Sequence, residues 1–425
     1  MSYFGSKVTL KDGPQLDAFS RLRVAIPSTI FDSQQEYGLD TYRMWDAVAN
    51  GTYATASSNG SATSGGNAVG PTNSNTRMTP ITCSSTNGDY AILQSRQYVR
   101  YNPGKGHLVL ITGVFAADAT HTAKFVLRTS TSGSVSDSNN VEQASWNIDP
   151  MDGTGPSGVT LDLTKTQILF ISAQWLGVGR VVMGFDIDGI LYPCHQFLNA
   201  NNLAVPYSQS FNLPVRLEGQ TVVTDTVNRV GYFDTNNGAF LQTTSTVAGG
   251  TINFVCCSVQ SEGGEASRGV TMGASNGITT IGVTTRRPIL SIRPKATFNS
   301  RTNRGHIILE DVALTASTNS AFYELIYGGT LTGASFASVN TDSCAEYDVS
   351  ATTISGGLPL ATGFAIAGSG VARGATSNVL DFRNPLVLQQ VNSLTATQTA
   401  ISVVATSFSG TSTLSAALNW SEKVI

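Results

Sequence analysis

Short runs in which β-branched, aromatic and aliphatic residues alternate with polar ones recur along most of the chain. Examples are YAILQSRQYVRY at residues 90–101, HLVLITGVFA at 107–116 and QILFISAQWLG at 167–177. Clusters of Gly, Asn, Asp and Ser separate the runs, whereas amphipathic patterns of helical length are almost absent. Alternation with a period of two between turn residues is typical of half-buried strands. The pattern therefore predicts an all-β chain.

The strand-like runs form two groups with a polar stretch, SEGGEASRG at residues 261–269, between them. The second group includes RPILSIRPK at 287–295 and TAISVVATSF at 399–408. Many short strands with regular turn signals are typical of sandwiches and barrels. We expect two β-sandwich, jelly-roll-like domains, at residues 81–262 and 263–425.

The first 80 residues differ from the rest in pattern. Residues 1–48 mix apolar and charged residues without a sustained helical period, which favours an extended N-terminal anchoring arm. Residues 49–80 include NGTYATASSNGSATSGGNAVGPTNSNT, which has almost no charge and few large apolar residues. Such a segment buries too little surface to offset its ordering entropy, so we expect a loop or linker unless neighbouring subunits clamp it.

Charged residues make up 12% of the 425 residues, against roughly 25% in ordinary soluble domains. Neutral hydroxyl and amide groups pair across interfaces without the desolvation cost of buried charges, so this surface suits closely packed copies. We expect a homo-oligomer, with a trimer favoured. The formal net charge of −3 argues against a nucleic-acid binder.

The N-terminal sequence MSYFGSKVTLKDG has no apolar h-region, and no stretch reaches the roughly 18 apolar residues of a membrane span. We therefore expect neither a signal peptide nor a membrane protein. The five cysteines form no CxxC pair, and the adjacent Cys256 and Cys257 lack the spacing of a zinc site. Buried free thiols, with no metal and no cofactor, are the expectation.

Three segments resemble fragments of ligand-binding motifs. GTGPSG at residues 153–158 fits the GxGxxG pattern, but Pro156 and the alternating strand pattern after it favour a turn over the strand-to-helix junction of a dinucleotide site. FDIDG at 185–189 and FDTNNG at 233–238 resemble calcium loops but lack the glutamate at the twelfth position. Both predict hairpin turns.

Two side-chain groupings invite a catalytic interpretation. Cys194 and His195 are adjacent in a strand-like run and so point to opposite faces, which argues against a nucleophile and base pair. An acidic and aromatic group could suggest a sugar-cutting tailspike, although Asp favours turns and Trp is commonly packed; its members are Asp149, Asp152, Asp162, Trp146 and Trp175. We expect no catalytic residues and no enzyme activity.

One region concentrates basic residues. It meets an acidic patch on a partner subunit or forms a solvated strand edge protected by charge, and the sequence favours neither alternative. Its members are Arg286, Arg287, Arg293, Lys295, Arg301 and Arg304.

Several long motifs carry a resemblance to a known family. They are LDAFSRLRV with TIFDS near the N-terminus, SWNIDPMDGTGPSGVTLDLTKTQI, WLGVGRVVMGFDIDGILYPCHQFLNANNL, NLPVRLEG, SIRPKATFNSRTNRG, ELIYGGTLTGASF and ALNWSE. Through them the chain resembles a recurrent family of tailed-bacteriophage virion structural proteins. The motifs extend over most of the sequence.

The resemblance implies an accessory component of the virion, a decoration, fibre or connector made in the host cytoplasm and attached to capsid or tail subunits. The arm would then anchor the protein by adding to a partner's sheet edge or filling a groove, through Leu16, Phe19, Arg21, Leu22, Arg23 and Phe31. The alternative is a host-recognition tail fibre or spike that binds a cell-surface glycan through residues 50–76 and exposed aromatics such as Tyr207.

Overall fold

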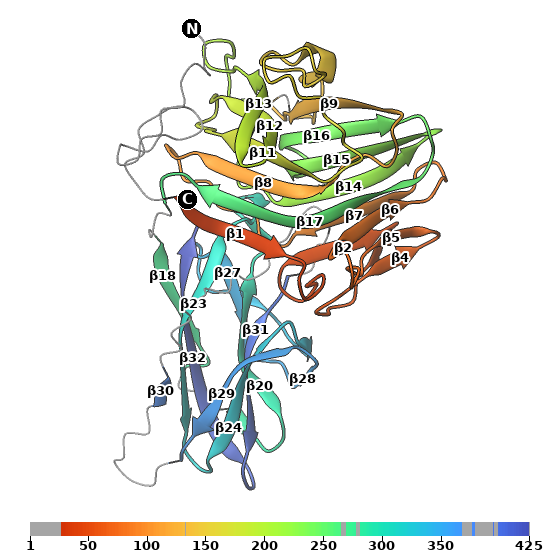
Figure 1. Cartoon of the computed structure of the whole chain (residues 1–425). Helices are drawn as coiled ribbons and strands as arrows, with labels where there is room; N and C mark the ends of the chain where they lie inside the picture. The colour runs from red at the N-terminus through yellow and green to blue at the C-terminus, as the bar shows by residue number, and fades with distance from the viewer. Residues whose placement is uncertain are drawn as a thin grey trace. The chain divides into compact units, whose positions relative to one another are not determined.

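The structure is a computed structural model, in which residue contacts divide the chain into two compact units, Met1–Ala266 and Ser267–Ile425 (Figure 1). The described residues are 27–131, 133–264, 269–277, 281–367, 376–378, 394 and 398–424. Within these ranges both units consist of antiparallel strands, and the only helical turn is η1 (Gln143–Ser145). The all-β prediction is confirmed. None of the described segments forms a helix long and apolar enough to cross a membrane.

Two large sheets form the first unit. The nine-stranded sheet has the order β13 (Ile190–Phe197), β12 (Val181–Ile187), β11 (Gln167–Ala173), β8 (His107–Val114), β17 (Gly250–Ser261), β6 (Thr79–Cys83), β5 (Asn67–Val69), β4 (Ala62–Ser64), with β1 (Ser28–Gln34) also on β17. The eight-stranded sheet has the order β10 (Asn140–Glu142), β9 (His121–Arg128), β16 (Gly238–Ser245), β15 (Asp225–Phe233), β14 (Val215–Val222), β7 (Tyr90–Ser95), β2 (Trp45–Ala49), β3 (Thr52–Tyr53).

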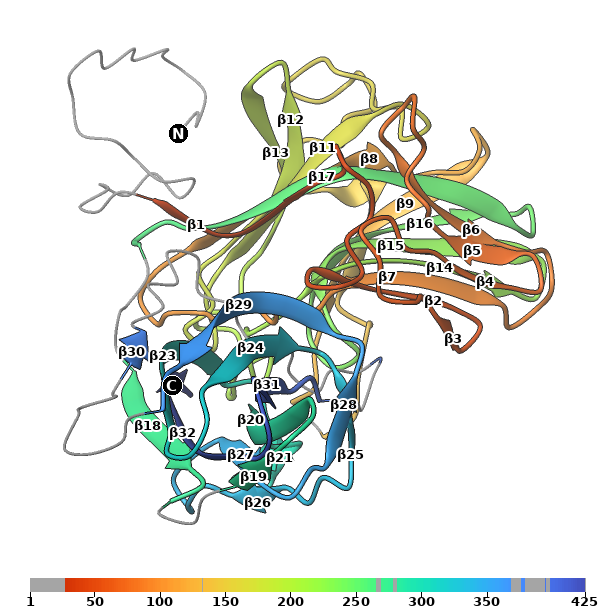
Figure 2. The same cartoon turned by 90° about the horizontal axis from the view of Figure 1, so that it is seen from below.

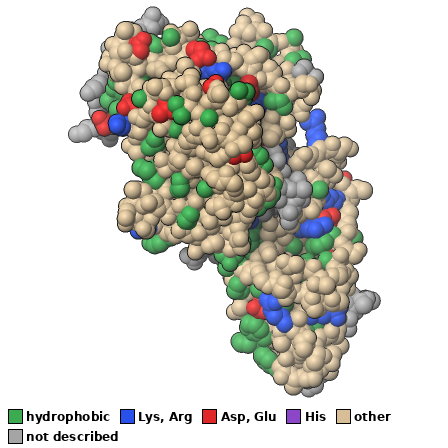
Figure 3. Space-filling model, turned by 90° about the vertical axis from the view of Figure 1, so that its right-hand side faces the viewer, with side chains coloured by type: hydrophobic (Ala, Val, Ile, Leu, Met, Phe, Trp, Pro, Cys, Tyr) green, Lys and Arg blue, Asp and Glu red, His purple; other side chains and the backbone are tan. Residues whose placement is uncertain are grey.

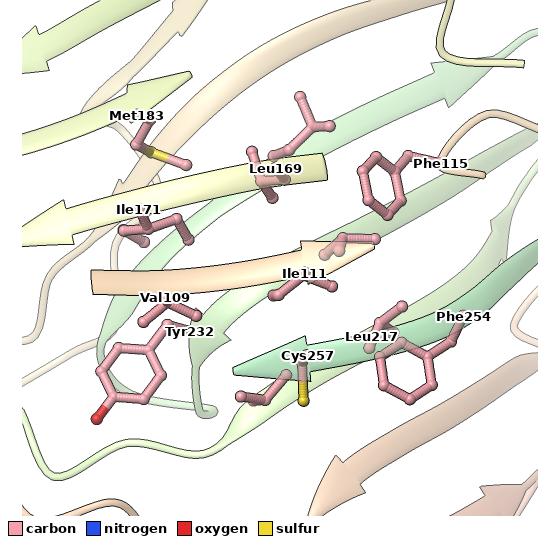
Figure 4. Close-up of a cluster of buried hydrophobic side chains, with 14 of the residues drawn as sticks. Val109, Ile111, Phe115, Leu169, Ile171, Met183, Leu217, Tyr232, Phe254 and Cys257 are labelled. Atoms are coloured by element: carbon pink, nitrogen blue, oxygen red, sulfur yellow. The ribbon is translucent and has the colours of Figure 1, made fainter. Parts of the chain in front are cut away.

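Apolar side chains from both sheets form one core between them, as expected of a β-sandwich. Ile111 and Leu169 come from the nine-stranded sheet, and Leu217 comes from the eight-stranded sheet (Figure 4). Trp45 on β2 packs edge-on against Phe254 on β17, with ring centroids 5.1 Å apart. Alternate residues of each strand supply these contacts because successive side chains point to opposite faces.

The second unit also contains two facing sheets (Figure 2). The five-stranded sheet has the order β18 (Val270–Ser275), β32 (Ser412–Lys423), β23 (His306–Ala316), β30 (Thr376–Asn378), with β19 (Ile281–Val283) on β32. The six-stranded sheet has the order β26 (Ala337–Ser338), β27 (Ala345–Asp348), β20 (Arg287–Pro294), β31 (Ile401–Ser407), β24 (Ala321–Tyr327), β29 (Leu358–Ala365). Two small hairpins pair β21 (Thr297–Phe298) with β22 (Arg301–Thr302) and β25 (Thr330–Thr332) with β28 (Thr353–Ser355).

Strict alternation in β32 shows how the sequence builds the second core. Every other residue of this 12-residue strand is buried, including Leu414, Leu418 and Trp420, each at 0% exposure. Facing residues such as Leu325 on β24 complete the core. Burial of a side chain of this size contributes roughly 1.5–3 kcal/mol, so a one-residue slip that turned this row to solvent would be costly.

The predicted N-terminal arm does not extend through residue 48, because the chain from Ser28 onward belongs to the first sandwich. Ser28–Gln34 forms β1, which pairs with β17 in the nine-stranded sheet, and Trp45–Ala49 forms the fully buried strand β2. Phe31 on β1 is 6% exposed and packs against Trp45 with ring centroids 5.9 Å apart. The prediction of an arm over residues 1–48 was therefore wrong from Ser28 onward.

Residues 49–80 are also part of the first sandwich, contrary to the predicted loop or linker. They contain the hairpin of β4 and β5, in which Ala62 and Val69 are buried. Hydrogen bonds to a side-chain amide also hold the segment in place, because Asn59 Oδ1 accepts hydrogen bonds from the backbone N–H groups of Leu39 (3.0 Å) and Thr72 (2.9 Å). Counting apolar surface alone missed this source of order.

Candidate interaction surfaces

The residues of the GTGPSG segment form a turn, as predicted. Asp149 accepts hydrogen bonds from the backbone N–H groups of Met151 and Ser157, each at 2.8 Å, and so fixes this loop. Residues 185–189 and 233–238 connect β12 to β13 and β15 to β16 as the predicted hairpins. In the described ranges, no three His, Cys, Asp or Glu side chains gather closely enough to hold a metal ion.

The cysteine, histidine and tryptophan candidates pack in the interior. Cys194 and His195 are both buried on β13, where the pairing with β12 is irregular, and burial lowers the pKa of His195 to about 4, so its ring is neutral at pH 7. The Sγ of Cys194 lies 3.1 Å from the Sδ of Met151. Trp146 stacks on Phe125 with centroids 4.2 Å apart. The packing interpretation of these residues is confirmed.

Of the six residues predicted to anchor the arm, the structure describes one. Leu16, Phe19, Arg21, Leu22 and Arg23 lie outside the described residues. Phe31 lies inside them, and its ring is part of the core of the first sandwich, so it is not exposed to a partner.

Two of the six basic residues form ion pairs within the second unit. Arg286 Nε lies 2.7 Å from Glu324 Oε2, and Arg293 Nε lies 2.5 Å from Glu346 Oε1. The guanidinium of Arg293 also stacks 3.8 Å from the ring centroid of Phe336. These charges are therefore balanced within the chain.

The remaining basic residues are dispersed. Lys295 donates hydrogen bonds to the carbonyls of Asn340 (2.9 Å) and Ser343 (2.6 Å), and Arg287 donates to Gly282 O at 3.4 Å. Arg301 lies on the exposed β21–β22 hairpin, and Arg304 is partly buried. Because β20 is an inner strand between β27 and β31, Arg287 and Arg293 do not lie on a strand edge.

A group of exposed aliphatic side chains, which we call the aliphatic patch, lies on two loops at one end of the first sandwich. It comprises Leu176 (53% exposed), Leu198 (57%), Leu203 (44%) and Val205 (55%). Exposed apolar residues that gather on one part of a surface mark interaction sites, and these four lie on neighbouring loops. A signal was present in the sequence, since LNANNLAVP places apolar residues inside an asparagine-rich turn.

Direct contacts fix the two loops of the aliphatic patch to each other. The N–H of Tyr207 donates to Gly177 O at 2.9 Å, and the side-chain amide of Asn199 donates to Gly179 O at 2.8 Å. A Cβ on Gly179 would lie 1.4 Å from Gln174 O, so only glycine fits this tight turn. Leu176 adopts a positive φ of 37°, a strained conformation for leucine that keeps it exposed.

A second exposed group, which we call the aromatic patch, lies on the outer face of the six-stranded sheet. Phe364 (56% exposed) has ring centroids 5.8 Å from Phe322 and 5.8 Å from Phe408 (60% exposed), and Ile366 is 67% exposed. Hydrophobic side chains gather at the lower end of the second unit in Figure 3, beside an acidic and a basic side chain. Only the fold brings these strands together, so no local sequence pattern indicated the patch.

A buried ionic cluster lies on the outer face of the eight-stranded sheet. Glu218 accepts hydrogen bonds from Arg216 Nε (2.7 Å) and Arg229 Nη1 (2.8 Å), and Arg216 also donates to Gln94 Oε1 (2.7 Å). Burial opposes ionisation of Glu218, but the two guanidinium groups outweigh it and lower its pKa to about 2. With all three charges engaged, the cluster is a stabilising element of the sheet.

Tyr207 does not support the predicted glycan contact. It is 1% exposed, and burial raises its pKa well above the usual range. Two exposed phenyl rings that lie close to each other, Phe364 and Phe408, belong to the second unit instead.

No family model and no curated protein matches the chain. Two solved structures overlap with about half of it. The carbohydrate recognition domain of Emp46p in its potassium-bound form has a TM-score of 0.16 and 10% identity, over 53% of this chain and 96% of that chain. The metal-free lectin I-B4 from Griffonia simplicifolia has a TM-score of 0.18 and 8% identity, over 56% and 99%. Likeness at these TM-scores carries no argument about the chain.

Proposed function

We propose that this chain is an accessory structural protein of a tailed-bacteriophage particle, attached to capsid or tail subunits and assembled as a homo-oligomer, with a trimer favoured. The resemblance of the long sequence motifs to phage virion proteins supports the assignment to a virus particle. The observation that carries attachment is the aliphatic patch, because exposed leucine and valine side chains on fixed loops are stabilised when a partner covers them.

Strand register places the aliphatic patch where the N-terminal residues enter the first unit. Ser28 pairs with Ser261, Ser261 with His107, and His107 with Ala173, so these residues form one row across the nine-stranded sheet. The loop that carries Leu176 follows Ala173 directly. Ser28, the first residue of β1, therefore lies at the end of the sandwich that carries the aliphatic patch.

Attachment through both elements would explain how a small patch holds a particle protein. A stable interface buries about 800 Å² on each partner, more than four partly exposed aliphatic side chains supply. An extended segment that crosses a partner's surface adds area and main-chain hydrogen bonds. We therefore propose that the N-terminal residues and the aliphatic patch contact the same neighbouring virion protein.

A matched pair of substitutions tests this attachment. Val205→Asp places a charge in the aliphatic patch, whereas Val247→Asp does so in the β16–β17 turn at the opposite end of the sandwich. The two valines are 55% and 54% exposed, so the variants should have equal folding stability. Purified chains would be mixed with particles that lack the protein, and bound chain would be measured after sedimentation.

We expect Val205→Asp to abolish binding and Val247→Asp to bind like the wild type. Equal binding by both variants would refute attachment through the patch. Sedimentation of the purified chains alone identifies the occupant: if Val205→Asp dissociates the homo-oligomer, the patch is covered by a second copy and the proposed virion contact is wrong.

A second candidate function is recognition of a cell-surface glycan. One observation favours it, the aromatic patch of the second unit, in which three phenyl rings lie together and two of them are more than half exposed. Exposed aromatic rings stack on the apolar faces of sugars. This function is compatible with the first because the two patches belong to different units.

A further inference from the structure

We infer that the aromatic patch is a binding site for neutral hexopyranose units of a polysaccharide or glycan. The inference rests on the second candidate function and gives it a site and a class of ligand. It is independent of attachment through the aliphatic patch.

The rings form a continuous apolar surface. Phe364 on β29 is directly opposite Phe322 on β24, and Phe408 follows the end of β31. Neighbouring rings are inclined by 53° and 49°, so together they form a faceted surface instead of a single plane. A pyranose presents C–H groups on one face, which the electron-rich faces of aromatic rings attract.

Polar groups lie beside the rings on the same face of the sheet. Thr406 is directly opposite Phe322, and Thr362 is two residues before Phe364 on β29. Next along the strands is Glu324, directly opposite Thr362 and paired with Arg286. Threonine hydroxyls donate and accept, carboxylates accept and guanidinium groups donate, which matches the mixed capacity of sugar hydroxyls.

Charge favours a neutral sugar over an acidic one. The guanidinium of Arg286 is 2.7 Å from Glu324 and also donates to Ile354 O at 3.0 Å. An acidic sugar would have to compete with Glu324 for this cation, and the displaced carboxylate would lose its partner. Hydroxyl groups can instead bond to the outer edges of the pair without separating it.

A second copy of the chain fits the aromatic patch less well. Exposures between 56% and 67% leave roughly 100 Å² on each of Phe364, Ile366 and Phe408, or about 300 Å² for the three together. A stable protein interface needs about 800 Å² on each partner. A stack of one or two sugar units requires much less area.

A shallow site of this kind binds each sugar unit weakly, and several copies of the chain in one assembly compensate for this low affinity. Pockets that bind small ligands tightly enclose most of the ligand, which an exposed surface does not do. Several copies held in one assembly convert later contacts with a repeating polysaccharide into intramolecular events. The proposed homo-oligomer therefore increases the avidity of this site for repetitive glycans.

The test uses the full chain and the methyl glycosides of glucose, galactose and mannose as probes. Saturation-transfer-difference NMR would measure contact of each sugar with the wild type and with Phe364→Ala, Phe364→Leu and Phe364→Tyr. Tyr37→Ala is the control because Tyr37 is an 85% exposed aromatic residue in the first unit. Thermal unfolding would verify that each variant is folded.

We expect at least one sugar to bind, with affinity reduced roughly tenfold in Phe364→Ala and Phe364→Leu and retained in Phe364→Tyr and Tyr37→Ala. The leucine variant separates ring stacking from general apolar contact. Absence of binding by the wild type would overturn the inference, as would full binding by Phe364→Leu. Dissociation of the homo-oligomer in Phe364→Ala would also overturn it, because a second copy would then cover the patch.

The same variants distinguish this inference from the proposed attachment. Phe364→Ala should bind to particles normally, and Val205→Asp should bind sugar normally. Loss of particle binding by Val205→Asp with no sugar binding by the wild type would leave attachment supported and refute the glycan site.

Discussion

Replacement of Phe31 separates two explanations of the N-terminal region. If Phe31 anchors the chain to a partner, Phe31→Ala weakens attachment and leaves folding stability unchanged. If it belongs to the core, the substitution destabilises the first sandwich. The side chain is 6% exposed and its ring contacts Trp45 at 5.9 Å, which favours the second outcome.

The magnitude follows from this burial. Phe→Ala in a core costs about 3–5 kcal/mol, and we expect about 3 kcal/mol because β1 pairs with one strand only and can partly collapse into the space. This loss corresponds to more than a hundredfold change in the folding equilibrium. Asp32→Ala is the control, since Asp32 is exposed on the opposite face of β1 and its replacement should change stability by about 0.5 kcal/mol or less.

Urea unfolding monitored by tryptophan emission provides the assay. Three of the four tryptophans, including Trp45, belong to the first unit, so the signal reports mainly on this sandwich. An unchanged unfolding midpoint in Phe31→Ala, together with lost particle binding, would refute the core assignment. Deletion of residues 1–26 then tests the arm itself, whereas a deletion that extended through Gln34 would also remove β1.

Two further predictions concern the stability and reactivity of buried groups. Glu218→Gln should destabilise the first unit by about 3 kcal/mol at pH 7 in urea unfolding, because two guanidinium groups lose their anion. The pKa of Glu218 is about 2 in the folded chain, against 4.5 ordinarily, so its contribution to folding stability is complete above about pH 5 and declines as the pH falls toward 2. Equal pH dependence of the stability of the wild type and the variant between pH 5 and 2 would contradict this prediction. Thiol reagents at neutral pH should modify the native chain at the partly exposed Cys256 and spare the other four cysteines. Burial raises the pKa of the other four thiols, to about 12 for Cys83, and so keeps them in the unreactive protonated form. Rapid labelling of Cys257, detected by mass spectrometry, would contradict this prediction.

Local patterns in the sequence predicted much of the fold because strands and hairpins are specified locally. Alternation identified β8 and β11, and the Asp-Gly and Asn-Gly steps identified the turns at Gly189 and Gly238. The boundary between the units, at Ala266, is close to the predicted one because the polar stretch there interrupts the alternation. Each of these features depends on neighbouring residues only.

The features that the sequence missed depend on contacts between distant residues. Residues 49–80 were predicted as a loop because few of them are apolar, but Asp89 accepts hydrogen bonds from the amides of Asn50 (2.6 Å) and Asn67 (2.7 Å) and fixes the segment. A short hydrogen bond from Ser84, followed by the two amide bonds, lowers the pKa of Asp89. A local pattern cannot show which carboxylate an asparagine will contact.

The same limit applies to the interaction surfaces. Phe322, Phe364 and Phe408 each occur in an ordinary strand pattern, and only the order β31-β24-β29 places them side by side. Conversely, Arg286 and Arg293 are close in sequence and suggest a basic surface, but glutamates neutralise both. The basic residues are close in sequence, which led us to predict a basic interface larger than the structure supports. The three phenylalanines are far apart in sequence, so the aromatic patch was not predicted.

The chemistry of the two patches argues that attachment and recognition are separate properties of the two units. The aliphatic patch consists of exposed leucine and valine side chains at the same end of the sandwich as Ser28, which suits burial against protein. In the second unit the chain enters beside Glu422 at one end of β32, while the aromatic patch adjoins the other end, roughly 35 Å away at the usual rise per residue. The rings therefore lie far along β32 from the point where the chain enters the second unit. Substitutions in one patch should leave the function of the other intact.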